Sequence, residues 1–132
     1  MKYLLDTDVC IYLIKKQPSS VLEKLEVCRA GDVGISAVTV AELRYGASKS
    51  QRPKQNHEAL DQFLAPFELM PFDDNAAAAY GEIRAHLEKT GDLIGPLDML
   101  IAGHAKSLDV TLVTNNIREF KKVKGLKIEA WR

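Results

Sequence analysis

Three carboxylates stand among apolar residues in this sequence, where charged side chains are unusual. Asp6 follows two leucines, Glu42 lies between an alanine and a leucine, and Asp98 lies between a leucine and a methionine. Carboxylates that are held close together in a partly apolar pocket repel one another, and they resist ionisation unless a cation joins them. If the fold brings these three acids together, they form a site for a metal ion.

The positions of the acids relative to the expected strands and helices favour such a meeting. Asp6 and the turn at Asn115–Asn116 each come just after a strand-like run, whereas Glu42 and Asp98 fall in the first turns of expected helices. In an open parallel α/β sheet, the carboxyl ends of the strands and the amino ends of the following helices converge on one edge, which is the usual ligand site. We therefore expect these side chains to lie together at one edge of a sheet.

The chemistry of these ligands selects the ion. Carboxylates and amides are hard oxygen donors, which favour Mg²⁺, with Mn²⁺ as a substitute, over structural zinc. No histidine or cysteine stands at a metal-ligand spacing, and His57, His86 and His104 are scattered along the chain. We interpret His86 and His104 as surface or packed residues of helices.

Helix capping offers a different explanation for the same residues. An aspartate between a strand and a helix, such as Asp6, is an ordinary cap. Thr39 and Glu42 match the capping box, and Asp98 suits the positive end of a helix dipole. Each explanation serves one residue taken singly, but capping does not explain why three such acids have apolar neighbours.

Strand-like and helix-like runs alternate along the chain, which indicates a mainly parallel sheet with crossover helices. The strand-like runs are 2–5, 33–35, 69–72, 110–113 and 127–131. The helix-like runs are 7–16, one that starts at Pro18, 36–46, one through 60–64, 74–90, 97–108 and a short one through 120, with 51–56 as a polar connection. We expect an α/β fold of four to five short strands flanked by helices, in a single domain over residues 1–132.

Composition limits how the protein can contact its partners. Lysine plus arginine equals aspartate plus glutamate, 18 against 18, so any nucleic acid must be held by local charge. Cations gather in two stretches, Lys49, Arg52 and Lys54, and then Lys121, Lys122, Lys124, Lys127 and Arg132. No apolar run approaches the roughly 20 residues of a membrane span, and no signal peptide fits the N-terminus. We expect a cytoplasmic location without membrane contact, and Cys10 and Cys28 as buried thiols.

Four motifs together resemble a known family. They are Leu-Leu-Asp-Thr-Asp at 4–8, Ser-Ala-Val-Thr-Val-Ala-Glu-Leu-Arg-Tyr-Gly at 36–46, Gly-Pro-Leu-Asp-Met-Leu-Ile-Ala at 95–102 and Leu-Val-Thr-Asn-Asn-Ile-Arg-Glu-Phe at 112–120. In this order and spacing they resemble the PIN domain and, more narrowly, the VapC-type toxins of bacterial toxin–antitoxin pairs. The resemblance covers nearly the whole chain, including the Glu-Ala-Trp ending at 129–131.

The resemblance implies a Mg²⁺-dependent endoribonuclease that cleaves transfer or ribosomal RNA and inhibits translation. It further implies a homodimer and a cognate VapB-type antitoxin protein, which we expect to place apolar side chains against the early helix around Tyr12 and Leu13.

The resemblance also assigns roles to residues of the site. The acids of the family carry over onto Asp6, Glu42 and Asp98, and Thr114 with Asn116 match its strand-end polar pair. Asp6 and Asp98 are expected to bind the ion, Glu42 to bind it and to orient or deprotonate the attacking water, and Thr114 with Asn116 to position phosphate or water. Many PIN domains have aspartate at the position of Asn116, so a second metal ion is less firmly held here.

Two alternatives remain open at this point. Asp6 followed by Asp8 also fits a phosphatase of the haloacid-dehalogenase type, in which Asp6 is a nucleophile, Asp8 a general acid and Ser36 a further site residue. That fold needs an acidic pair after a late strand, which residues 114–116 do not offer. The other alternative is a non-enzymatic interaction module whose acids only cap helices.

Overall fold

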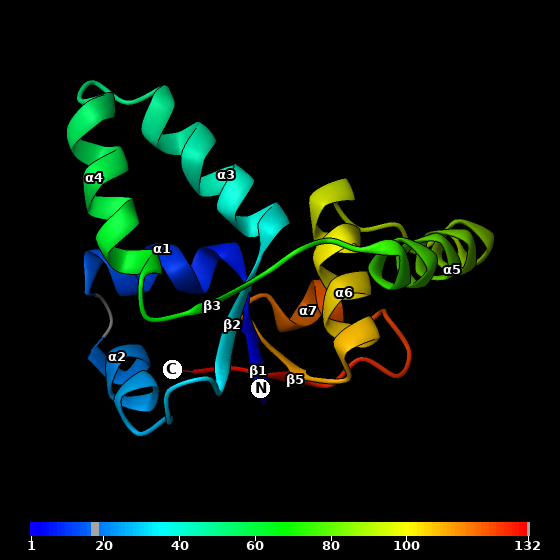
Figure 1. The fold of residues 1–132 in the computed structure, drawn as a ribbon. Helices are drawn as coiled ribbons and strands as arrows, with labels where there is room; N and C mark the ends of the chain where they lie inside the picture. Colours follow the sequence, from blue (N-terminus) through cyan, green and yellow to red (C-terminus); the bar gives the residue numbers. More distant parts are fainter. Residues whose placement is uncertain (17–18, 132) are drawn as a thin grey trace.

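The computed structural model of the chain describes residues 1–16 and 19–131 (Figure 1). Within this part, five strands form one sheet in the order β3-β2-β1-β4-β5, and every neighbouring pair is parallel. The strands are β1 (Tyr3–Leu5), β2 (Val33–Ser36), β3 (Glu68–Met70), β4 (Thr111–Val113) and β5 (Ile128–Glu129). The predicted α/β fold with a parallel sheet of four to five short strands is confirmed.

Helices connect the strands and cover both faces of the sheet. They are α1 (Thr7–Lys15), α2 (Ser19–Glu26), α3 (Ala37–Ser48), α4 (Pro53–Leu64), α5 (Asp74–Thr90), α6 (Pro96–Leu108) and α7 (Ile117–Phe120). Three begin at a side-chain cap, because Asp6, Ser36 and Asp73 accept hydrogen bonds from backbone N–H groups of α1, α3 and α5. Figure 1 shows α1 to α4 on one side of the sheet and α5 to α7 on the other.

Several predicted boundaries differ from the structure. Residues 51–56 are not a connection throughout, because α4 already begins at Pro53, where a proline suits the first turn of a helix. The strands β3 and β5 are shorter than the predicted runs 69–72 and 127–131. Pro18, the predicted start of the second helix, lies outside the described residues, as does Arg132.

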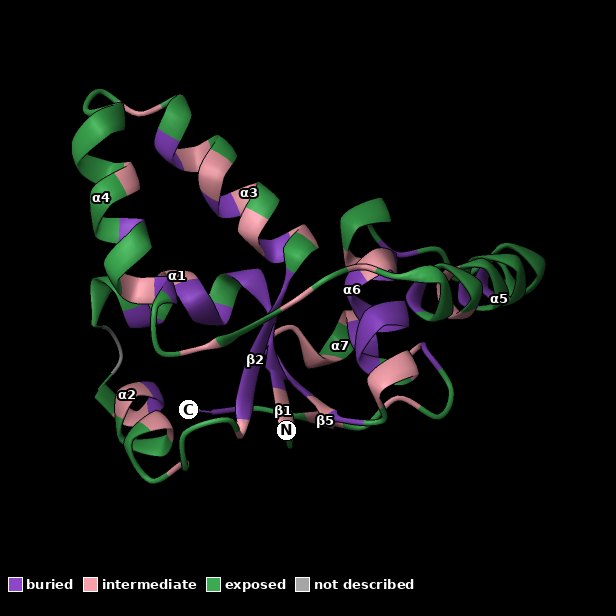
Figure 2. Cartoon of the chain, viewed as in Figure 1, coloured by how far each residue is buried: buried purple, intermediate pink, exposed green. Residues whose placement is uncertain are grey.

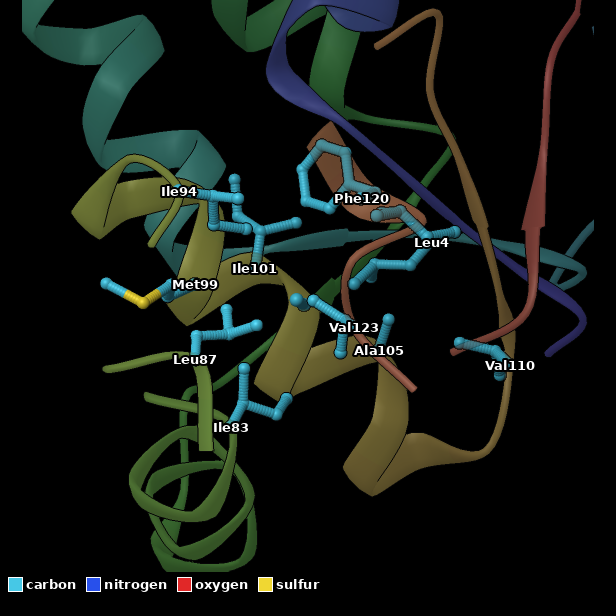
Figure 3. Packing of buried hydrophobic residues seen from close by; sticks show 12 residues of the cluster. Leu4, Ile83, Leu87, Ile94, Met99, Ile101, Ala105, Val110, Phe120 and Val123 are labelled. Carbon is cyan, nitrogen blue, oxygen red and sulfur yellow. The ribbon is translucent and has the colours of Figure 1, made fainter. Parts of the chain in front are cut away.

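Two hydrophobic cores flank the sheet, because successive residues of a strand point to opposite faces. Leu4 of β1 and Leu112 of β4 belong to the core under α5, α6 and α7, which Figure 3 shows around Phe120 and Ile101. Leu5 and Val113, the next residues of the same strands, belong to the core under α1 to α4. Figure 2 shows β1 and β2 largely buried between the two helical layers, whereas the edge strands β3 and β5 are partly exposed.

The two cysteines differ in their surroundings. Cys10 is fully buried in the core under α1, and burial raises the pKa of its thiol, whereas Cys28 is only half-buried. The prediction of a buried thiol is therefore confirmed for Cys10, whereas Cys28, which follows the end of α2, is only partly buried against the core under α1 to α4. None of the helices in the described residues is long and apolar enough to span a membrane.

The contact between α5 and α6 requires a glycine. A Cβ at Gly103 would lie 2.8 Å from the Cα and the backbone nitrogen of Tyr80, so no side chain fits between these helices. Gly103 therefore allows α6 to pack closely against α5. Because α6 carries Asp98 at its amino end, this packing also helps to position Asp98.

Gly103→Ala should lower the free energy of unfolding by about 1–3 kcal/mol, because the backbone of Tyr80 must move to admit a methyl group. Gly81→Ala in α5 is the matched control, since its added Cβ meets no atom within 4 Å. This control should be more stable than the wild type by about 0.5–1 kcal/mol. Chemical denaturation of both variants measures the difference, and equal stability of Gly103→Ala and wild type would refute the close-packing argument.

Candidate active site

The register of β1 and β4 brings the first two site residues together. Leu5 pairs with Val113, so Asp6 and Thr114 are the first residues beyond neighbouring strands. The Asp6 backbone N–H donates to the Val113 carbonyl at 2.9 Å, and Thr114 Oγ1 donates to Asp6 Oδ2 at 2.8 Å. Because β1 lies between β2 and β4 in the sheet, this pair stands at the topological switch point where α/β folds bind ligands.

Hydrogen bonds hold the Asp6 carboxylate on both oxygens. Its Oδ1 accepts from the Thr7 backbone N–H at 2.8 Å, which is the cap of α1. Thr114, fully buried, is itself fixed by the Asn116 backbone N–H, which donates to Thr114 Oγ1 at 3.0 Å. The structure thus places the Thr114 hydroxyl beside Asp6, where it donates a hydrogen bond to that carboxylate. Asn116 lies next to Thr114 at the half-buried amino end of α7.

Glu42 reaches the same place from α3 through a residue that the sequence analysis missed. Thr7 Oγ1 donates to Glu42 Oε1 at 2.8 Å, and Thr7 Oγ1 lies 3.1 Å from the buried Thr39 Oγ1. Thr7 therefore links Asp6 to Glu42, with its N–H on one carboxylate and its hydroxyl on the other. The spacing of Thr39 and Glu42 on one helical face was a signal for this contact, although the same spacing also matched a capping box.

The structure excludes the alternative explanation of Thr39 and Glu42 as a capping box. Ser36, not Thr39, caps α3, because Ser36 Oγ accepts from the Val38 N–H at 3.1 Å. Thr39 is the third residue of the helix, and its hydroxyl contacts Thr7 instead of an N–H group at the start of α3. Glu42 is therefore free of a capping role. Asp6, by contrast, both caps α1 and lies in the site.

Asp98 is the third residue of α6 and is half-buried. Burial raises the pKa of its carboxyl, and the charges of Glu42, Asp8 and Glu119 raise it further. Glu42 comes from α3, Asp8 from α1 and Glu119 from α7, so acids of four helices lie within electrostatic range of one another.

Asp6 feels the same repulsion from a more buried position. Burial raises the pKa of Asp6 to about 6, the hydrogen bonds from Thr114 and the Thr7 N–H lower it, and the charges of Asp98 and Asp8 raise it again. Burial outweighs the two hydrogen bonds. The ionised form of Asp6 is therefore energetically unfavourable at neutral pH when no cation is near it.

The donor set fits a hydrated hard cation. Asp6, Asp8, Glu42 and Asp98 take part in none of the ion pairs between side chains that the described residues form. In the same part of the chain, no three carboxylate, histidine or cysteine side chains lie close enough to enclose an ion by themselves. Mg²⁺ keeps several of its waters and needs only one or two carboxylates, so these oxygen donors suit it.

Ser36 and His104 lie behind the site and do not face it. Ser36 is fully buried, and its Oγ lies 2.7 Å from His104 Nδ1 of α6. Burial lowers the pKa of His104, and the ring also donates to the Pro71 carbonyl, so the ring is neutral and its Nδ1 accepts a hydrogen bond from the Ser36 hydroxyl. This bond joins α3, which carries Glu42, to α6, which carries Asp98. The interpretation of His104 as packed is confirmed, and His86 is exposed on α5.

Comparison with known proteins identifies the fold. The family model of the PIN domain matches residues 3–126. The chain belongs to the PIN-domain family. Two curated relatives cover 99% of this chain and 98% of their own length: the tRNA(fMet)-specific endonuclease VapC of Shigella flexneri, 44% identical over 131 residues, and the ribonuclease VapC2 of Rickettsia felis, 45% identical over 132 residues. Within the PIN-domain family, the chain is a VapC-type ribonuclease.

Solved structures of VapBC complexes have the same fold. VapBC2 from Rickettsia felis, bound to a DNA fragment from its promoter, superposes with a TM-score of 0.94 at 44% identity and full coverage of both chains. DNA-bound VapBC from Salmonella typhimurium gives a TM-score of 0.95 at 40% identity, covering 100% of this chain and 99% of that one.

Membership of this family argues against the haloacid-dehalogenase alternative, and so does the geometry. The Ser36 hydroxyl that such a phosphatase would use is fully buried between Val38 and His104.

Without metal, the wild type should lose more stability than Asp6→Asn as pH rises from about 4 to about 7, because the raised pKa of Asp98 acts in both proteins and that of Asp6 in the wild type alone. The pKa of Asp6 is about 6 in the fold and about 3.9 in the unfolded chain. The folded state therefore holds the proton more tightly, and its advantage is lost between about pH 4 and about pH 6. From about pH 4 to about pH 7, Asp6→Asn should gain about 2–3 kcal/mol relative to wild type.

Chemical denaturation in a chelator at several pH values measures this gap. Asp92→Asn, on an exposed loop, should follow the wild type at every pH. A gap between Asp6→Asn and wild type that stays constant with pH would contradict the raised pKa of Asp6.

Proposed function

We propose that this VapC-type ribonuclease is a Mg²⁺-dependent endoribonuclease and the toxin of a toxin–antitoxin pair. The observation that carries the metal dependence is the Asp6 carboxylate, buried at the switch point of the sheet and facing the charges of Asp98 and Asp8. The names of the relatives, an endonuclease specific for tRNA(fMet) and a ribonuclease, support the reaction. We propose transfer RNA as the substrate, and inhibition of translation follows from its loss.

Asp6 and Asp98 would hold the ion, with Glu42 near enough to share it or one of its waters. When bound there, Mg²⁺ supplies positive charge that offsets the carboxylates and the charge that develops on the phosphate. The buried hydrogen bonds from Thr114 and Thr7 fix the orientation of Asp6, so that carboxylate needs no rearrangement when the ion and RNA bind.

Glu42 is suited to act as the general base. Its Oε1 accepts a hydrogen bond from the Thr7 hydroxyl. Its Oε2 is then left to orient the attacking water and to take up the proton of that water. Water would attack the phosphorus while the bond from phosphorus to O3′ breaks, and the leaving oxygen would take a proton from solvent. The products are a 5′-phosphate and a 3′-hydroxyl, and the 2′-hydroxyl of RNA takes no part. Thr114 would act through Asp6, and Asn116, half-buried beside that pair, would position the phosphate.

Asp98→Asn should abolish RNA cleavage, and Glu42→Gln should slow it by about a hundredfold or more, because both variants lose a charge while keeping their shape. Cleavage of transfer RNA in Mg²⁺ and thermal unfolding in chelator measure the two effects separately. Asp92→Asn is the control with a neutralised exposed acid. Full cleavage by Asp98→Asn would refute the metal site, whereas wild-type turnover of Glu42→Gln alone would remove the general base.

We also propose an antitoxin partner, since the structural neighbours are VapBC complexes. An apolar hollow of about 250 Å³ lies where α1, α3 and α4 meet, bounded by Ile14, Leu43 and Leu60. Ile14 and Tyr12 on α1 are 41% and 37% exposed. Leu13 is 5% exposed and belongs to the core, so its predicted place on the docking surface is wrong; Ile14 takes that place. The expected homodimer and cytoplasmic location stay predictions.

Tyr12→Asp combined with Ile14→Asp should abolish copurification with the product of the neighbouring gene, because a charge cannot enter an apolar contact without cost. Val27→Asp is the matched control, since Val27 is an apolar residue with 82% exposure after the end of α2. Tagged wild type and variants, expressed with the neighbouring gene, give the comparison. Unchanged recovery of the partner with the double variant would exclude this surface.

A further inference from the structure

A groove leads away from the site between α1 and α3. It has a volume of about 550 Å³, and Thr7 and Glu42 form one part of its wall. A volume in this range accommodates a small ligand or a nucleotide. In Figure 1 both helices leave the same end of the sheet and run to the same side of the molecule, diverging as they go. The groove therefore begins at the catalytic carboxylates and opens outward.

Charge changes sign along this groove. Asp8 and Glu42 line its inner part. Lys15, the last residue of α1, and Lys49, directly after α3, line it seven residues further along the chain from each acid. At the rise of an α-helix, seven residues correspond to about 10 Å. Neither lysine belongs to the ion pairs formed by the described residues, so both are available to an anion beyond the site.

An exposed aromatic ring lies between the acids and the lysines. Tyr45 lines the groove one turn after Glu42 and is 65% exposed, which is unusual for so large a side chain. The Lys49 ammonium lies 4.9 Å from the centre of its ring. An exposed ring beside a cation is the arrangement that proteins use for single-stranded nucleic acid, since the ring stacks on a base and the cation meets a phosphate.

A neighbouring hollow lacks these features. It lies between α3 and α6 on the other side of Tyr45, has a volume of about 530 Å³, and is lined by Val38, Leu97 and Leu100 among others, with no lysine or arginine. Phosphate would find no positive charge there. Of the two hollows beside Glu42, only the groove between α1 and α3 matches the charge of RNA.

We propose that the groove between α1 and α3 binds the single-stranded RNA next to the bond that is cut. Tyr45 stacks on a base, and Lys15 and Lys49 contact the backbone phosphates. This assignment rests on the proposed ribonuclease function and adds to it the surface that grips the substrate. It also explains how a chain without net charge holds a polyanion locally.

The test measures the binding of a fluorescein-labelled RNA decanucleotide in Mg²⁺ by fluorescence anisotropy, with Asp98→Asn as the parent to prevent cleavage. Tyr45→Leu should weaken binding about fivefold or more, whereas Tyr45→Phe should not, because phenylalanine keeps the stacking face. Lys15→Gln and Lys49→Gln should each lower the dependence of log Kd on log salt by about 0.7. Tyr45→Leu should leave this salt dependence unchanged.

Lys89→Gln is the matched control, because Lys89 is an exposed lysine on α5, on the opposite side of the sheet. It should bind RNA as the parent does. Parent-like affinity of Tyr45→Leu, Lys15→Gln and Lys49→Gln would overturn the proposal. If these three variants kept their RNA affinity but no longer copurified with the antitoxin, the groove would be an antitoxin surface, and the proposal would also be overturned.

The outcomes also separate this proposal from the proposed function. If RNA binds with the expected variant effects but the wild type with Asp98 intact cleaves no RNA, the ribonuclease assignment fails and the groove assignment stands. If the wild type cleaves and the groove variants show unchanged affinity and KM, only the groove assignment fails. Absence of RNA binding by the parent would refute the groove.

Discussion

Burial of the Asp6 carboxylate at the end of the central strand is the constraint around which the site is built. Removing a carboxylate from water costs free energy, and here burial raises the pKa of Asp6 to about 6 despite hydrogen bonds on both of its oxygens. Capping of α1 alone would not require burial, since a cap works equally well on the surface. A cation that shares the pocket with Asp6 and Asp98 would offset this free-energy cost, because it favours the charged form of both carboxylates.

The fold concentrates its acids at this point by simple means. Parallel pairing of β1 with β4 sets Asp6 beside Thr114, and the buried bond between Ser36 and His104 joins the helices that bear Glu42 and Asp98. These contacts therefore hold the carboxylates near one another despite the repulsion between their charges. The two hydrophobic cores on either face of the sheet hold the strands rigid, so the site rests on regular elements instead of mobile loops.

Residue patterns predicted the sheet and the acids well because both follow from local rules. Apolar runs mark buried strands, and an acid that directly follows such a run must lie at the carboxyl end of that strand. Thr7 was missed because its role depends on Glu42, thirty-five residues away, and no local pattern reports such a pair. Leu13 was placed on the docking surface for a similar reason: packing into the core, and not periodicity alone, decides which side of a helix is buried.

The central claim is that Asp6 is a destabilised carboxylate awaiting a cation, and its own titration tests this most directly. In protein with ¹³C-labelled aspartate carboxyls, the resonance that Asp6→Asn removes should titrate with a pKa of about 6 in chelator. In saturating Mg²⁺ the pKa of this carboxyl should fall well below that value, because the cation favours the charged form. An Asp6 that titrates in the ordinary range of aspartate without metal, or whose pKa Mg²⁺ leaves unchanged, would contradict the account.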